Sequence, residues 1–193
     1  MLRIKTDKQF FSWDRAVVMG IMNVTPDSFY DGGRYQGIDA VLNQCNKMVE
    51  EGVDIIDIGA FSTRTGSVRV GADEESARIL PSLKAIRKEF PDIPISIDTF
   101  RKSVAQQCFE EGADIINDIS GGLFDDEMIP YIGSNHIPYI LMHITGTLET
   151  MHKENIISSN VHEEVRMFFE RQIAKLSEYG EQQVILDPGI GFN

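Results

Sequence analysis

Polar residues with carboxylate or amide side chains follow several apolar runs of the sequence, at the point where each run ends. The set comprises Asn23, Asp57, Asp98, the pair Asn117 and Asp118, and Asp187. Carboxylates and carboxamides around an apolar pocket support two kinds of chemistry: they bind a metal ion, or they read the donor-rich edge of a nitrogen heterocycle. A 2-amino-4-oxopyrimidine ring presents an N–H and an amine side by side, and one aspartate accepts both hydrogen bonds.

Each of these residues has a simpler interpretation when it is taken alone. A single Asp after a strand is more often the N-cap of the next helix than a ligand group, and this interpretation is favoured for Asp57, Asp118 or Asp31 individually. His143 fits a structural histidine better than a catalytic base. Five strand ends of the same character nevertheless favour one shared ligand site.

The stretch from Met19 to Gly33 is the most distinctive part of the sequence. Val17 to Met22 is almost wholly apolar, which is typical of a strand buried on both faces. Asn23 follows, and residues 25–33 are then rich in turn formers and hydroxyl groups. We expect this strand to deliver the amide of Asn23 to a bound ligand.

Alternating apolar patterns predict the elements that would position these residues. Apolar stripes at helical spacing predict helices at 38–51, from an N-cap at Asp73 to about 90, at 102–111, around 128–132 and at 161–179. Short apolar runs predict strands at 17–22, 53–58, 93–97, 114–119, 138–142 and 183–186. Residues 5–13 fit a lid strand or an entry segment that closes one end of the core.

One internal repeat supports this alternation. Residues 50–58 read Glu-Glu-Gly-Val-Asp-Ile-Ile-Asp-Ile, and residues 110–119 repeat the pattern of helix end, glycine and buried strand. Alternating strands and helices favour parallel βαβ units. Because the polar residues follow five different strands, a (β/α)₈ barrel is favoured over an open sheet with one switch point.

The length predicts an incomplete barrel. Six strands account for all 193 residues, and two further β/α units would need roughly 70 to 90 more residues. We therefore expect residues 1–193 to form a single barrel domain, truncated after its sixth strand.

Composition narrows the class of partner. The net charge of −12 disfavours nucleic acid and anionic membranes as general partners. No apolar run reaches the roughly 18 residues that a membrane span needs. Cys45 and Cys108 are far apart in the sequence and fit two buried thiols in a reducing compartment, so we expect a cytoplasmic protein.

The motifs resemble those of dihydropteroate synthase, the pterin-binding (β/α)₈ family of folate biosynthesis. Residues 19–33, with Asn-Val-Thr-Pro-Asp-Ser-Phe and Asp-Gly-Gly, resemble the first signature of that family closely. Residues 57–66 resemble its second signature. Ile97-Asp98-Thr99, residues 116–119 and residues 186–192 resemble the others, in the same order along the chain.

The resemblance implies a transferase. In that reaction, 4-aminobenzoate displaces pyrophosphate from 6-hydroxymethyl-7,8-dihydropterin diphosphate. It implies that Asp98, Asn117 and Asp187 hold the pterin, that Asp98 stabilises the cation formed when pyrophosphate leaves, and that Asn23 meets the diphosphate and a Mg²⁺ ion. The remaining substrate-binding residues that it implies are Phe29, Thr63, Arg64, Met142 and Phe192.

Two departures and two alternatives accompany the resemblance. Phe61 and Thr65 replace the usual Glu and Pro of the second signature, which predicts altered affinity for aminobenzoate and for sulfonamides that mimic it. The family's later Ser/Lys and Arg-x-His motifs are absent from this sequence, so we expect little activity from residues 1–193 alone and a homodimer only at full length. The alternatives are a methyltetrahydrofolate–corrinoid methyltransferase and a non-catalytic pterin-binding module.

Overall fold

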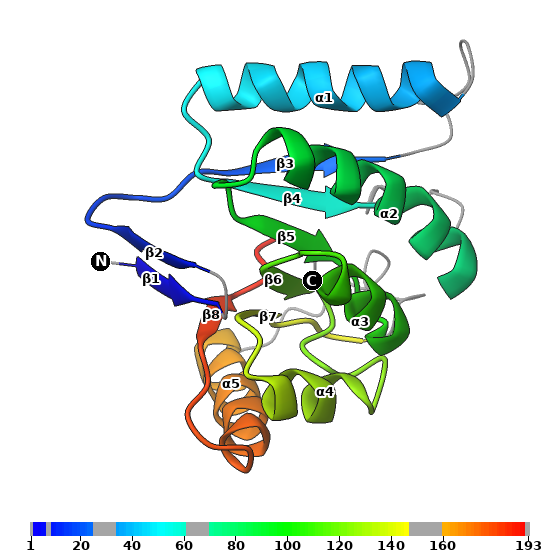
Figure 1. Cartoon of the computed structure of the whole chain (residues 1–193). Helices are drawn as coiled ribbons and strands as arrows, with labels where there is room; N and C mark the ends of the chain where they lie inside the picture. Colours follow the sequence, from blue (N-terminus) through cyan, green and yellow to red (C-terminus); the bar gives the residue numbers. More distant parts are fainter. Residues whose placement is uncertain (1, 7–8, 25–33, 61–69, 147–159, 192–193) are drawn as a thin grey trace. The chain divides into compact units, whose positions relative to one another are not determined.

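The computed structural model describes residues 2–6, 9–24, 34–60, 70–146 and 160–191 (Figure 1). Eight strands and five helices lie in these ranges. The strands are β1 (Leu2–Lys5), β2 (Phe10–Trp13), β3 (Met19–Asn23), β4 (Ile55–Gly59), β5 (Ile95–Asp98), β6 (Ile115–Asp118), β7 (Tyr139–Met142) and β8 (Val184–Asp187). The helices are α1 (Arg34–Glu50), α2 (Ala72–Glu89), α3 (Lys102–Glu110), α4 (Met128–Asn135) and α5 (Val161–Ser177).

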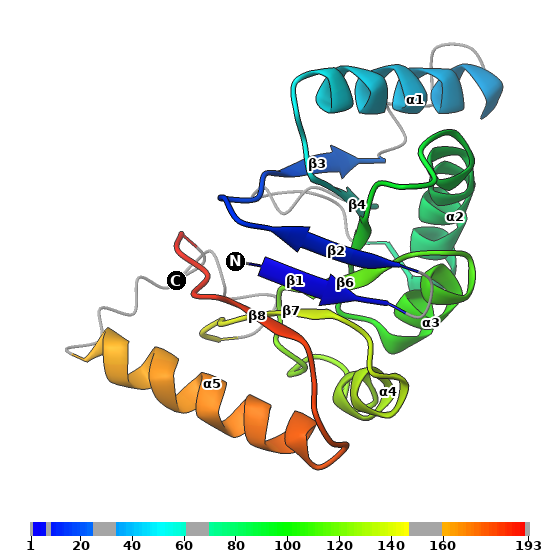
Figure 2. The same ribbon diagram turned by 60° about the vertical axis from the view of Figure 1, so that its left-hand side comes forward.

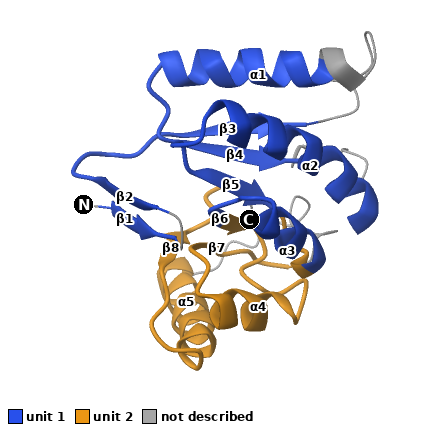
Figure 3. Cartoon of the chain, viewed as in Figure 1, with its two compact units in different colours: residues 1–98, 103–115 blue, residues 99–102, 116–193 orange. Residues whose placement is uncertain are grey.

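The chain divides into two compact units (Figure 3). Unit 1 holds residues 1–98 and 103–115, and unit 2 holds residues 99–102 and 116–193. From β3 onward, strands and helices alternate strictly along the chain, so the alternation predicted from the sequence is confirmed.

Unit 1 is built on three parallel strands in the order β3-β4-β5. Strands β4 and β5 are rich in isoleucine and almost wholly buried. Helix α1 packs beside β3 and against α2, and α2 packs beside β4 (Figures 1 and 2). In β3 only Met22 is buried and Ile21 is 63% exposed, so the prediction that this strand is buried on both faces is wrong. Strand β3 begins two residues later than predicted and includes Asn23. The predicted N-cap of α2 is wrong, since Gly71 takes that position and Asp73 lies in the first turn.

The internal repeat has a structural reason, because each copy makes the same reciprocal bond to the preceding strand. The N–H of Asp54 donates to the carbonyl of Val18 (2.9 Å), and the N–H of Val18 donates back to the Asp54 carboxylate (2.9 Å). Asp114 and Ile95 repeat this exchange at 2.8 and 2.9 Å. We call these two pairs the strand latches, since the Val18–Asp54 pair fixes the start of β3 and the Ile95–Asp114 pair fixes the start of β5.

An arginine completes each strand latch. Arg15 makes a bidentate pair with Asp54 (2.6 and 2.7 Å). Arg87 of α2 donates to the Asp114 carboxylate and also to the carbonyls of Gly112, Pro91 and Ile93. The two latches differ in exposure, because 58% of the Arg15 side chain is exposed but only 22% of Arg87.

The N-terminal segment forms an antiparallel hairpin of β1 and β2, in which Leu2 pairs with Trp13 and Lys5 pairs with Phe10 (Figure 2). Ile4 is buried, and the rings of Phe11 and Trp13 stack with their centroids 6.0 Å apart. The hairpin is tied to the rest of unit 1 by a hydrogen bond from the Gln9 amide to the carbonyl of Pro91.

Unit 2 carries the parallel strands β6-β7-β8 and the neighbouring helices α4 and α5. Ile116 is in register with Tyr139, and Met142 with Asp187. The ring of Tyr179 packs against Gly133 of α4. A Cβ added at Gly133 would lie 2.5 Å from Cδ2 of that ring, so only glycine at this position permits the packing.

Both cysteines are free and buried, as the sequence predicts. Burial raises the pKa of Cys45 to about 11 and that of Cys108 to about 12, so both thiols stay protonated at neutral pH. None of the helices in the described residues is long and apolar enough to span a membrane.

Candidate active site

In unit 1, three residues lie in one row at the C-terminal ends of the strands. Asn23 of β3 is in register with Gly59 of β4, and Gly59 is in register with Asp98 of β5. Residues in register on parallel strands point to the same face of the sheet. The Asn23 amide and the Asp98 carboxylate therefore flank a position that has no side chain.

The next row down the same face is deeply buried on β4 and β5 but exposed on β3, where 63% of Ile21 is exposed. It contains Ile21, Asp57 and Ser96, and the exposed fractions of Asp57 and Ser96 are 3% and 0%. Asp57 lies inside β4 and α2 begins only at Ala72, so the N-cap interpretation of Asp57 is wrong. The hydroxyl of Ser96 has no hydrogen-bond partner among the described residues.

In unit 2, Asn117, Met142 and Asp187 share one face of the β6-β7-β8 strands. Met142 and Asp187 are in register, and Asn117 is in register with Ile140, two residues before Met142. Because side chains alternate along a strand, residues two apart face the same way. Three of the residues predicted to bind substrate are thus brought to one face of unit 2.

The Asp187 side chain is held in place by its neighbours. Its Oδ1 accepts a hydrogen bond from the Gly189 N–H (2.9 Å), and the His143 N–H donates to the Asp187 carbonyl (2.8 Å). Gly189 has a φ of +66°, and a Cβ added there would lie 2.1 Å from the carbonyl oxygen of His143. Only glycine fits this position, and Oδ2 is the carboxylate oxygen that Gly189 does not engage.

Asp118 points to the opposite face from Asn117 and has a structural role. Its carboxylate accepts hydrogen bonds from the N–H and hydroxyl of Ser120 (both 2.7 Å), the N–H of Gly122 (2.9 Å) and the hydroxyl of Tyr139 (2.6 Å). Burial raises the pKa of Asp118, and these hydrogen bonds oppose that rise. The carboxylate fixes the loop after β6. The N-cap interpretation of Asp118 is wrong, since α4 begins at Met128 with Glu127 as its N-cap.

His143 is also structural, as predicted. Its ring is buried and lies edge-on to Phe168, with centroids 5.0 Å apart. Burial lowers the pKa of His143 below its ordinary value of 6.5, so the imidazole is neutral at pH 7.

In unit 2, Thr99 is held by two hydrogen bonds. The Thr99 N–H donates to the carbonyl of Asn117 (3.0 Å), and the Arg101 N–H donates to the Thr99 hydroxyl (3.2 Å). The predicted site residues Phe29, Thr63, Arg64 and Phe192 lie outside the described residues.

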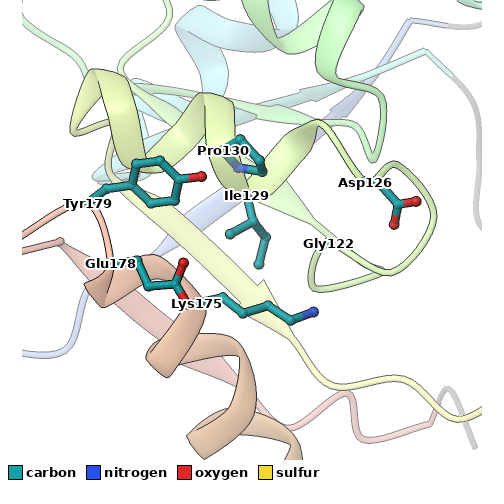
Figure 4. Close-up of a pocket in the computed structure, with 7 residues that line it drawn as sticks. All are labelled: Gly122, Asp126, Ile129, Pro130, Lys175, Glu178 and Tyr179. Carbon is teal, nitrogen blue, oxygen red and sulfur yellow. The ribbon is translucent and has the colours of Figure 1, made fainter.

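A pocket of about 180 Å³ lies between α4 and α5 of unit 2 (Figure 4). Ile129, Pro130 and Tyr179 form its apolar wall, and Lys175 and Glu178 are among its charged groups. It contains none of the residues that the sequence singles out, and it belongs to the helix layer rather than to the strand ends.

The described residues hold no group of three or more His, Cys, Asp or Glu side chains that could bind a metal ion. Carboxylate and amide groups at the ends of parallel strands instead suit a polar planar ligand, whose N–H groups they can accept. The fold and the site therefore define the class: an α/β protein of alternating strands and helices, with carboxylate and amide groups at the C-terminal ends of the parallel strands of each unit.

Comparisons with known proteins specify the family. Residues 19–193 match the pterin binding enzyme family. A dihydropteroate synthase of Synechocystis sp. is 46% identical over 186 residues, covering 94% of this chain and 63% of that protein. The chain thus spans less than two thirds of the length of this relative.

Two solved structures are similar over nearly the whole chain. The Yersinia pestis dihydropteroate synthase with a sulfonamide drug has a TM-score of 0.85 at 32% identity and covers 99% of this chain and 69% of its own. The Burkholderia cenocepacia enzyme with 7,8-dihydropteroate has a TM-score of 0.82 at 32% identity and covers 98% of this chain and 64% of its own. The chain belongs to the pterin-binding enzyme family, and the predicted (β/α)₈-barrel fold class is confirmed.

Sequence reasoning missed Gly59, Ser96 and Gly189 as parts of the site. The signal for Ser96 was present, because the order Ile95-Ser96-Ile97-Asp98 places Ser96 on the face of Asp98. The glycines carry no comparable signal, since their importance depends on which atoms of other segments approach them.

Proposed function

We propose that the full-length protein is a dihydropteroate synthase, which joins 6-hydroxymethyl-7,8-dihydropterin diphosphate to 4-aminobenzoate and releases pyrophosphate. The observation that carries this proposal is the 46% identity to a dihydropteroate synthase across 94% of the chain. The residues implied by the resemblance lie at strand ends: Asn23 and Asp98 in unit 1, and Asn117, Met142 and Asp187 in unit 2.

The pterin would be held by Asp98, Asn117 and Asp187. The pterin ring carries an N–H and an amine side by side, and a carboxylate accepts both in a charge-assisted pair. An asparagine amide accepts one hydrogen bond and donates another, so it suits a ring edge that carries both a donor and an acceptor. Met142, buried on the face of Asp187, would pack against the ring.

The chemical step breaks the bond between the pterin methylene carbon and the diphosphate oxygen. The electron pair leaves with pyrophosphate, and the methylene becomes a cation conjugated with the ring. Asp98 stabilises that positive charge electrostatically while it binds the ring. The aminobenzoate nitrogen then forms the new C–N bond and loses its proton.

Asn23 would meet the diphosphate and a Mg²⁺ ion. Its exposed amide at the end of β3 supplies one oxygen ligand, and Mg²⁺ typically takes few protein ligands and completes its shell with phosphate oxygens and water. When bound, Mg²⁺ neutralises charge on the leaving group.

The loops outside the described residues would complete the site. Phe29, Thr63, Arg64 and Phe192 are proposed to bind aminobenzoate, and exclusion of water from the occupied site would protect the cation from capture. We further propose that the full-length protein is a cytoplasmic homodimer.

Pyrophosphate release from the full-length protein tests the proposal. With both substrates and Mg²⁺, we expect release that depends on 4-aminobenzoate. We expect Asp98→Asn to reduce kcat/KM by roughly 100-fold, since it removes the charge that both binds the ring and stabilises the cation. No pyrophosphate under these conditions would exclude the synthase. Methyl transfer from methyltetrahydrofolate instead would identify a corrinoid-type methyltransferase, and pterin binding without either reaction would identify a binding module.

A further inference from the structure

We infer that Gly59 is a positioning residue for the pterin, because the absence of its side chain sets where the Asp98 carboxylate lies. The inference rests on the proposed function, in which Asp98 binds the pterin ring. It extends the site to a residue that itself carries no chemical group.

The contact is direct. A Cβ added at Gly59 would lie 3.2 Å from Oδ2 of Asp98 and 3.3 Å from its Cβ. Separations this short are tighter than ordinary van der Waals contact, so the neighbour has to move by a few tenths of an ångström. The two residues are in register on β4 and β5, and the carboxylate occupies the space that a Gly59 side chain would take.

Backbone conformation does not explain this glycine. Eight described glycines have a positive φ, and Gly59 is not one of them. Within a strand, glycine is less favourable than alanine because it costs more conformational entropy and packs no side chain. The close approach of Asp98 therefore remains as the physical reason for a residue without a Cβ.

Displacement of the carboxylate should affect ligand binding more than folding. Hydrogen bonds weaken steeply when distance and angle depart from their best values, and a bidentate pair needs both oxygens in place. Rotation of the Asp98 side chain relieves the contact with Oδ2, and a strand shift of a few tenths of an ångström relieves the contact with its Cβ. We expect Gly59→Ala to raise the Kd for 6-hydroxymethyl-7,8-dihydropterin diphosphate about tenfold and to leave the thermal midpoint within a few degrees of the parent.

Two other glycines of unit 1 provide matched controls. A Cβ at Gly20 would lie 2.9 Å from Val53 Cγ2 and 3.1 Å from Met48 Sδ, on the face of β3 that packs on α1. Gly20→Ala should lower the thermal midpoint without changing the Kd of the folded protein. A Cβ at Gly71 meets no atom within 4 Å, so Gly71→Ala should leave the Kd unchanged, and replacing the N-cap glycine of α2 by alanine should lower the thermal midpoint only slightly.

A double-mutant cycle separates positioning from general distortion. Titration calorimetry with the dihydropterin diphosphate would compare Gly59→Ala in the parent with Gly59→Ala in an Asp98→Ala background of the full-length protein. If Gly59 acts through the carboxylate, the substitution raises Kd in the parent and changes it less than twofold where the carboxylate is absent. Equal fold-changes in both backgrounds, or no change in the parent, would overturn the inference.

The failure of this inference is distinguishable from failure of the proposed function. If the parent protein releases pyrophosphate and Gly59→Ala leaves the Kd unchanged, the proposed function stands and only the positioning role of Gly59 is wrong. A parent that binds no dihydropterin diphosphate contradicts both.

Discussion

Removal of the Asp114 carboxylate should destabilise the protein more than removal of its counterpart in the repeat, Asp54. Both residues make the same reciprocal bond to the start of a preceding strand, so the chemistry removed is the same. They differ in their surroundings. The Asp114 latch joins the interior of unit 1 and its arginine is largely covered, whereas Arg15 is exposed.

The magnitude follows from what each substitution leaves unpaired. In Asp114→Ala, the buried N–H of Ile95 loses its acceptor, which costs about 1–3 kcal/mol. Arg87 loses its charged partner, but it still donates to three backbone carbonyls and is partly solvated. We therefore expect Asp114→Ala to lower the free energy of unfolding by about 3 kcal/mol, the lower end of the range for a broken buried ion pair. In Asp54→Ala, water can replace the acceptor of the exposed Val18 N–H, and we expect about 1 kcal/mol.

Urea unfolding measures both variants against the parent, with far-ultraviolet circular dichroism for the helices and the fluorescence of Trp13, the single tryptophan, for the hairpin. Asp114→Asn is the matched control: it keeps an acceptor for Ile95 and loses the charge, so its cost should lie between the two alanine variants. Equal costs for Asp54→Ala and Asp114→Ala would refute the reasoning, because burial would then not decide the strength of a latch.

Three further predictions concern other parts of the chain. Gly189→Ala should cost at least about 2 kcal/mol in thermal unfolding, since it places a Cβ at positive φ against the carbonyl of His143; a stable variant that binds pterin normally would contradict it. Because burial lowers the pKa of His143, the unfolded chain takes up a proton near pH 6.5 that the folded protein does not, so stability should fall as the pH drops below 6.5. In His143→Gln, the free energy of unfolding should fall less below pH 6.5 than in the parent. A pH dependence of stability equal to that of the parent would contradict this prediction. Thr65→Pro, outside the described residues, should tighten sulfonamide inhibition of the full-length protein about two- to fivefold by restricting its loop; inhibition indistinguishable from the parent would exclude this.

Much of the architecture could be predicted because strands β4 to β7 are almost wholly buried, whereas β3 and β8 are partly exposed. Buried strands appear in the sequence as continuous apolar runs, and glycines such as Gly52 and Gly112, both at positive φ, mark where the preceding helices end. Boundaries were less predictable. Asp73 has the chemistry of an N-cap, but the cap lies two residues earlier, at Gly71.

The site could be predicted only as a set of strand ends. Asn117 and Asp118 are adjacent and both polar, so alternation places them on opposite faces without saying which face each one takes. Hydrogen bonds from Ser120, Gly122 and Tyr139 decide it, and these depend on how the following loop folds. Likewise, the closeness of Gly59 to Asp98 depends on strand register, which the sequence does not state.

The strand latches have a consequence for the order in which the chain folds during synthesis. Val18 and Asp54 are 36 residues apart in the sequence, and Ile95 and Asp114 only 19. Each latch can therefore close once its own βαβ segment has left the ribosome, without waiting for later residues. Contacts between residues close in the sequence also form at lower entropic cost. The repeated Glu-Glu-Gly-x-Asp segment thus fixes the starts of β3 and β5 early, before the residues that follow each βαβ segment have been synthesised.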